Sequence, residues 1–240
     1  MIVADWWIGT GLVAIAGFTR GFSGFGAGLI LAPSLSLLFP PQQVIATVLL
    51  LEMTAAGGLI PEAVHQTKWT EVLTLALSAA VMVPVGAYFL SILEPRMMRR
   101  VIGVLILGFV FLLTSGKHYF PKTHISFTSS IGALSGFLTG LAGIGGPPIV
   151  LYQLAGENTA ATNRANFISF FALTQFVALI SYWLSGLLSI DALLLFAHFA
   201  PIFLFGLFLG GFCFKRVNES LFRKFVFGLL LIAATLALVL

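Results

Sequence analysis

The chain has 240 residues, of which 59% are hydrophobic and only 8% are charged, and its formal net charge is +4. A soluble domain carries roughly 25% charged residues, so this composition excludes a protein whose surface faces water. The excess of positive charge is small and lies in the loops, which excludes a nucleic-acid partner and favours an orienting role in a membrane.

The hydrophobic runs predict an all-α, polytopic transmembrane helix bundle. A span needs about 20 apolar residues, and the runs allow about eight spans within one domain, residues 1–240. Two Gly-rich segments, 24–39 and 145–156, interrupt this pattern and are expected to be broken helices. The expected spans are 4–20, 42–64, 70–92, 98–115, 126–142, 163–184, 190–213 and 222–240.

The first Gly-rich segment recurs 119 residues later in the chain. "GFTRGFSGFG", which starts at Gly17, aligns with "GFLTGLAGIG", which starts at Gly136, with five identities in ten positions. This similarity predicts two repeat halves, 1–116 and 125–240. Internal repeats are common in transporters, where the binding site lies between the repeats.

The breaks predict a binding site. Irregular backbone is tolerated at membrane depth only inside protein or beside a wet cavity. Helices are expected to restart near Ala27 and at Pro147, and their N-terminal amides would attract an anion. The glycines that precede the breaks, within 9–21 and 132–140, are instead expected to serve close helix packing. The residues predicted to line the site at the breaks are Ser23, Gly24, Gly26, Gly143, Gly145, Gly146 and Pro147.

Charged and amide side chains within the spans extend this prediction. Arg20 precedes the first break and Arg164 follows the second, so each break has a candidate anion-binding arginine, although either side chain could instead reach the membrane interface. Glu52 is an ion-pair partner of Arg20, a proton acceptor that couples transport, or a plain hydrogen-bond partner. Further candidate ligands of the anion are Gln153, Asn163 and Asn166.

The basic residues predict an orientation. If each broken segment dips into the membrane and returns, loops after odd-numbered spans hold nine Lys and Arg residues and the other loops hold three. This split would place the odd loops in the cytoplasm. If the broken segments cross fully, the basic clusters at 96–100 and 215–224 would face opposite sides. The charge count favours the first arrangement, and it leaves open whether the halves are parallel or inverted.

Two stretches resemble the TauE/SafE family, also called the sulfite exporter family. They are "TRGFSGFGAGLILAPSLSLLFPPQQVIATVLLLE" and "GFLTGLAGIGGPPIVLYQLAGENTAATNRANF". The resemblance covers nearly the whole chain and implies a secondary transporter of the bacterial inner membrane for sulfite or organosulfur anions such as sulfoacetate. It implies no ATP-driven step, which agrees with the absence of a P-loop from the sequence.

The function expected from the sequence is therefore transport of a small anion held at two broken-helix N-termini, with no catalytic residue, cofactor or metal. Cys213 stands alone, and the four histidines show no metal-ligand spacing. One alternative is an intramembrane serine protease that uses Ser23 of "GFSG" with His198 as the base. The other alternative is a membrane scaffold that transports nothing.

Overall fold

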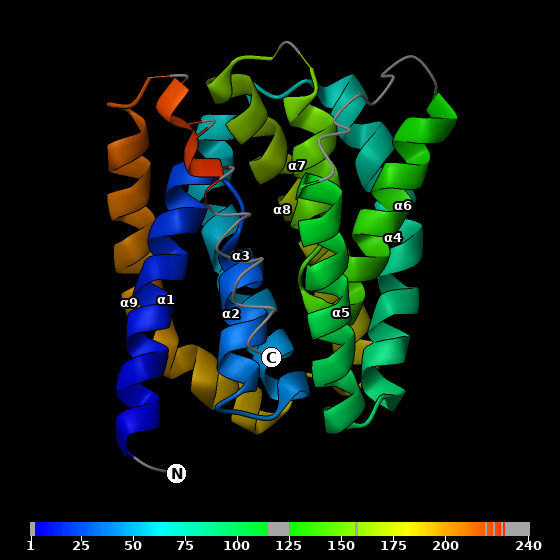
Figure 1. The fold of residues 1–240 in the computed structure, drawn as a ribbon, viewed down its shortest axis with the longest axis vertical. Helices are drawn as coiled ribbons and strands as arrows, with labels where there is room; N and C mark the ends of the chain where they lie inside the picture. The colour runs from blue at the N-terminus through cyan, green and yellow to red at the C-terminus, as the bar shows by residue number, and fades with distance from the viewer. Residues whose placement is uncertain are drawn as a thin grey trace.

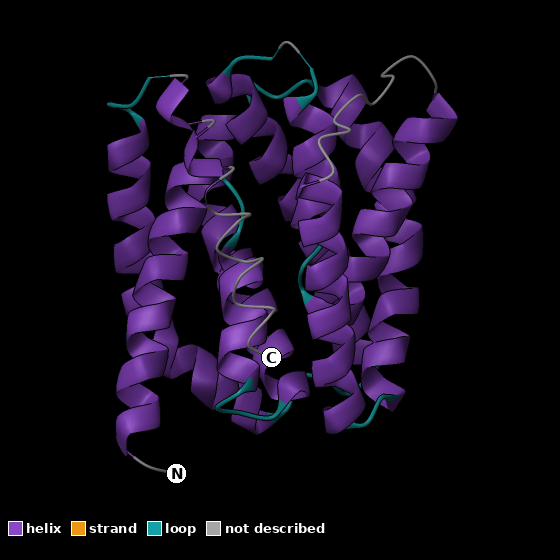
Figure 2. Cartoon of the chain, viewed as in Figure 1, coloured by secondary structure: helices purple, strands orange, loops and turns teal. Residues whose placement is uncertain are grey.

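The computed structural model describes residues 3–114, 125–156, 158–218, 220–222, 224–226 and 228, and the described part is helical throughout (Figures 1 and 2). Loops lie at the two ends of the bundle, and two further loops lie inside it at the Gly-rich breaks (Figure 2). The helices are α1 (Val3–Ser23), α2 (Ala27–Ser36), α3 (Pro41–Ala63), α4 (Trp69–Ile92), α5 (Pro95–Thr114), α6 (Ile125–Ala142), α7 (Gly146–Leu154), α8 (Ala160–Leu184) and α9 (Ile190–Phe214).

Local sequence explains where several helices begin. Pro41 occupies the first turn of α3, where its missing N–H costs no hydrogen bond. The side chain of Thr159 accepts a hydrogen bond from the amide of Thr162 at the start of α8. Ser189 caps α9 through the amide of Ala192 in the same way.

Five of the described helices are long and apolar enough to cross a membrane, namely α3, α4, α6, α8 and α9. Large apolar side chains point outward from them, including Leu77, Phe205 and Phe208, each more than 60% exposed. A water-soluble protein would bury such side chains, whereas lipid accommodates them. The chain is therefore a polytopic membrane protein, as the sequence predicts. The expected last span, 222–240, falls largely outside the described residues.

Glycines hold α1 against α9. A Cβ atom added at Gly17 or Gly21 would collide with the backbone carbonyls of Phe203 or Leu207 on α9. Gly206 and Gly210 of α9 meet the backbone of α1 in the same way. Only glycine permits so close an approach between the two helices, which is the usual means of packing helices in a membrane.

The second half repeats this arrangement with α6 and α4. A Cβ atom at any of the three α6 glycines, Gly132, Gly136 and Gly140, would meet the backbone of α4, and Gly86 of α4 meets α6. These glycines serve packing, as predicted. Gly11 is an exception within 9–21, because no described atom lies within 4 Å of its added Cβ. The first helix of each half thus packs on the fourth helix of the other, with α3 and α8 between the two pairs (Figure 1).

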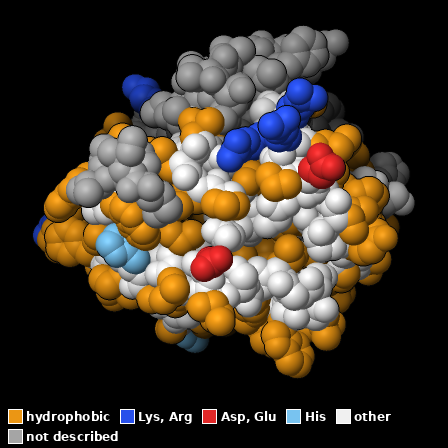
Figure 3. Space-filling view, turned by 90° about the horizontal axis from the view of Figure 1, so that it is seen from below, with side chains coloured by type: hydrophobic (Ala, Val, Ile, Leu, Met, Phe, Trp, Pro, Cys, Tyr) orange, Lys and Arg blue, Asp and Glu red, His pale blue; other side chains and the backbone are white. Residues whose placement is uncertain are grey.

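The expected path of the broken segments is wrong. In Figure 1, α1 rises from the lower end while α6 descends from the upper end, and α2 and α7 return to the lower and upper ends. The short helices α2 and α7 each bring the chain back to the end of the bundle from which α1 or α6 started. The next long helix therefore starts from that end, and not from the opposite end. The basic turn at 96–100 lies at the lower end, where Lys and Arg side chains gather (Figure 3), and Lys215 and Arg216 lie at the upper end. The two elements that carry the breaks therefore run in opposite directions.

Candidate functional site

The first break is a tight turn between α1 and α2. Gly24 and Gly26 have φ angles of 81° and 99°, a left-handed conformation that side chains with a Cβ rarely adopt. The hydroxyl of Ser23 lies 2.7 Å from the carbonyl oxygen of Thr19 and 2.8 Å from that of Phe25. Its hydrogen-bonding capacity therefore goes to the turn itself. The helix restarts at Ala27, as predicted.

The second break has the same outline but different donors. Gly143 has a φ angle of 68°, and the hydroxyl of Ser135 donates to the carbonyl of Gly145 at 2.5 Å. The helix restarts at Gly146, one residue before the predicted start. Pro147 and Pro148 follow within its first turn and have no N–H to donate. The N-terminus of α7 therefore offers fewer hydrogen-bond donors than a helix start without prolines.

The two breaks meet inside the bundle. A Cβ atom at Gly28 would collide with the carbonyl oxygen of Gly143, and one at Gly146 would lie 3.4 Å from the ring of Phe25. Between them is a cavity of about 10 Å³, room for roughly one water molecule. Its lining residues are Gly26, Gly28, Leu29, Glu52, Thr139, Gly143, Ile144, Gly146, Phe171 and Gln175.

A buried ion pair stands at this cavity. The side chain of Arg20 is 0% exposed, and its Nε lies 2.5 Å from Oε2 of Glu52. The other carboxylate oxygen of Glu52 accepts a hydrogen bond from the amide of Gly28, in the first turn of α2, at 3.3 Å. Among the described residues, Nη1 and Nη2 of Arg20 have no hydrogen-bond acceptor. Of the three roles expected for Glu52, the structure thus has the ion pair with Arg20. The carboxylate of Glu52 lies at the N-terminus of α2, where the sequence predicts a bound anion.

Arg164 lies at the first break rather than the second, which corrects the expectation of one arginine per break. Its Nη2 and Nε donate to the carbonyl oxygen of Gly21 at 2.8 and 3.3 Å. Its Nη1 lies 3.7 Å from a carboxylate oxygen of Glu62. The reason is that helices of the two halves pack against each other, which brings the start of α8 to the end of α1. At the equivalent carbonyl of the second half, that of Gly140, the donor is the hydroxyl of Tyr182 at 2.7 Å.

The three amide candidates, Gln153, Asn163 and Asn166, lie in a separate network near the upper end. The carbonyl oxygen of the Gln153 side chain accepts from Asn158 and Asn166, each at 3.2 Å. Asn166 in turn accepts from the backbone amide of Lys68 at 2.8 Å, and Asn163 donates to the backbone of Asn158. This network ties α7 and α8 to the connection between α3 and α4. None of the three lines the central cavity.

Sequence reasoning missed six cavity residues, namely Gly28, Leu29, Thr139, Ile144, Phe171 and Gln175. Gln175 is 6% exposed, and its Oε1 has no donor within the described part of the chain. The sequence could have indicated Gln175, because in "FALTQFVAL" it is the one amide side chain in an apolar span. The ring of Phe171 lies 5.5 Å from Cζ of Arg20, and no sequence pattern distinguishes it from the other phenylalanines.

The protease alternative finds no support in these positions. The oxygen of Ser23 contacts backbone carbonyls, and the ring of His198 packs against Trp6 and Phe199, with ring centroids 4.6 and 5.1 Å apart. A nucleophilic serine needs a base within hydrogen-bond reach. Neither side chain is placed for that role.

Comparison with known proteins identifies the family. The family model described as "Sulfite exporter TauE/SafE" matches residues 9–237. Comparisons with curated proteins and with solved structures found no match. The match spans nearly the whole chain and excludes the protease and scaffold alternatives, because members of this family are transporters. The chain belongs to the TauE/SafE family, whose members are membrane transporters of sulfite- or sulfonate-type anions.

Proposed function

We propose that this protein carries sulfite or a small organosulfonate across the bacterial inner membrane and binds the anion at the cavity between the two breaks. The observation that carries the proposal is Arg20, which is fully buried and leaves Nη1 and Nη2 without an acceptor among the described residues. A guanidinium donates two parallel hydrogen bonds, a geometry that suits an oxyanion. The backbone at Gly26 and Gly143 and the side chain of Gln175 complete the surroundings of the anion.

Glu52 gives the site a means of coupling. Its carboxylate pairs with Arg20 and accepts from Gly28, so it holds the position that a transported anion would take. An anion that binds Arg20 competes with this carboxylate, and protonation of Glu52 would remove the competitor. We therefore propose Glu52 as the proton-coupling residue.

The fold supplies a route to alternating access. The glycine-packed pairs α1–α9 and α4–α6 stand on either side of the central α3 and α8 (Figure 1). Because their backbones touch, each pair moves as a unit. Relative movement of the two pairs would part the breaks first toward one end of the bundle and then toward the other, as in other transporters built from inverted repeats.

Sulfite flux into proteoliposomes tests the proposal. Arg20→Lys keeps the charge but loses the planar fork, so we expect sulfite uptake to fall about tenfold or more. Arg96→Lys, an exposed change at the lower end, serves as the matched control and should leave uptake unchanged. Thermal melting of both purified variants shows whether they fold. Wild-type uptake by a folded Arg20→Lys protein would contradict the proposed site.

A further inference from the structure

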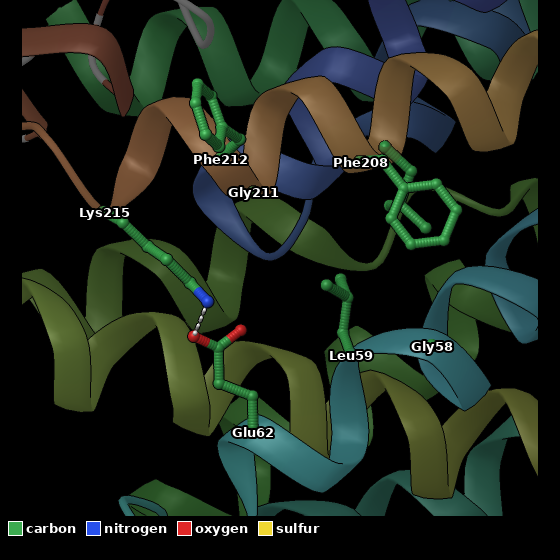
Figure 4. A pocket seen from close by; sticks show the side chains of 8 residues that line it. Gly58, Leu59, Glu62, Phe208, Gly211, Phe212 and Lys215 are labelled. Atoms are coloured by element: carbon green, nitrogen blue, oxygen red, sulfur yellow. Dashed lines mark ion pairs between the residues drawn. The ribbon is translucent and has the colours of Figure 1, made fainter.

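A second hollow opens between α3 and α9, above the central cavity and apart from it. Its volume is about 300 Å³. In Figure 4, the side chains of Leu59 and Phe208 border it, and Lys215 and Glu62 face each other at one end. That end is the upper end of the bundle, where α3 finishes and α9 finishes (Figure 1). We call this hollow the α3–α9 groove.

Two glycines keep the groove open. A Cβ atom at Gly58 would reach to 4.0 Å from the side chain of Leu207 across the groove. One at Gly211 would lie 3.8 Å from Nη2 of Arg164 and 3.9 Å from the carbonyl oxygen of Gly21. Gly211 therefore leaves the guanidinium of Arg164 directly behind the groove. The side chain of Arg164 is 5% exposed.

The charges at the groove are unbalanced. Glu62 lies 3.7 Å from Nη1 of Arg164 and 3.4 Å from Nζ of Lys215, so one carboxylate faces two cations. Its side chain is 44% exposed, which leaves it free to swing away into solvent. With Glu62 displaced, Arg164 and Lys215 would face one space from two sides. A small oxyanion fits between two such cations.

Arg164 links this space to the central site. The edge of its guanidinium that does not face Glu62 donates to the carbonyl of Gly21, the residue that follows Arg20. Glu62 and Glu52 lie ten residues apart on α3, which corresponds to about 15 Å along the helix. Each carboxylate is paired with an arginine. The groove and the central cavity therefore repeat one arrangement at two depths.

We infer that the α3–α9 groove is the upper entry site for the transported anion. The anion displaces Glu62 between Lys215 and Arg164, and then passes to Arg20. Glu62 acts as a gate because its carboxylate closes the space until an anion replaces it. This inference rests on the proposed function, but it has a readout of its own.

Thiol labelling provides that readout, in a Cys213→Ala background that removes the native cysteine of α9. Gly58→Cys lies in the groove, and its neighbour Gly57→Cys is the matched control, because no described atom lies within 4 Å of a Cβ there. We expect an anionic methanethiosulfonate that carries a sulfonate to label Gly58→Cys about tenfold faster than Gly57→Cys. Adding Lys215→Gln should slow this reaction about fivefold, but should not slow a trimethylammonium reagent. Equal rates of the two reagents at Gly58→Cys would overturn the inference.

Flux supplies the second arm. Gly58→Leu fills the groove and should lower sulfite uptake into proteoliposomes about tenfold relative to Gly57→Leu. Sulfite affinity of the two purified proteins should agree within about twofold, because the central site is unchanged. Equal uptake by the two variants would overturn the inference. The inference would also fail if a phospholipid occupies the groove of the wild type, and Gly58→Leu releases this lipid without lowering uptake. If the wild type moves no sulfite, the proposed function fails while the labelling result still decides the groove.

Discussion

Arg20 and Glu52 are the residues on which the chemistry of the proposed site depends. Arg20 is fully buried and Glu52 nearly so. Removing one partner of such a pair typically costs about 3–5 kcal/mol, because the other charge is then left uncompensated. A pair this costly to separate stays closed until another anion or a proton compensates the charge. The two groups are therefore suited to exchange partners during a transport cycle.

Glu52→Gln tests this exchange. The neutral amide keeps the size of the side chain but no longer competes with an anion for Arg20, so anion binding should become about tenfold tighter. A pH gradient should no longer accelerate uptake. Methanesulfonate is the suitable probe, because a sulfonate keeps one charge at every pH used and any pH effect then belongs to the protein. A pH-driven uptake equal to that of the wild type would exclude Glu52 as the coupling residue.

The neutral pair Arg20→Gln with Glu52→Gln is the control for stability. If the double variant melts near the wild type while Glu52→Gln melts lower, the loss comes from the uncompensated charge of Arg20. The transport result can then be separated from unfolding.

At the scale of elements, the breaks were predictable and their partners were not. Glycine and proline act on the backbone of their own segment, so the restarts at Ala27 and Gly146 follow from the local sequence within one residue. The pairing of α1 with α9 depends on backbone approaches between segments far apart in the chain. Arg164 was assigned to the wrong break for this reason, since its position depends on that pairing.

Gly136→Ala tests the close packing of α6 on α4. Its Cβ would collide with the backbone of Ala79, which cannot move aside as a side chain could. We expect a loss of about 1–3 kcal/mol in the free energy of unfolding, seen as a lower melting temperature in detergent. Gly11→Ala is the control, because no described atom lies within 4 Å of its added methyl group and alanine favours a helix by up to about 1 kcal/mol. Equal melting temperatures would show that the contact adapts.

In the whole molecule, the two halves are interlocked, which means that helices of one half pack against helices of the other. Each half places its first helix against the fourth helix of the other, through glycines on both sides of the contact. The units that we propose to move are therefore mixed pairs from both halves rather than the sequence halves themselves. The recurrence of the Gly-rich motif is visible in the sequence. The opposite directions of α1 and α6 are not, because the charge count does not fix the path of the broken segments.

Separate expression of the halves tests this interlocking. Residues 1–116 and 125–240, produced together as two chains, should assemble and restore sulfite uptake to within about threefold of the intact protein, because the contacts between halves are large and the connection adds only effective concentration. Either half alone should fail to fold, since α1 without α9 and α6 without α4 each expose a glycine-lined face. A chain divided inside α4, between residues 80 and 81, is the control and should not assemble, because the cut interrupts the helix that packs on α6. Uptake by one half alone would show that the halves are independent units and would remove the basis for movement in mixed pairs.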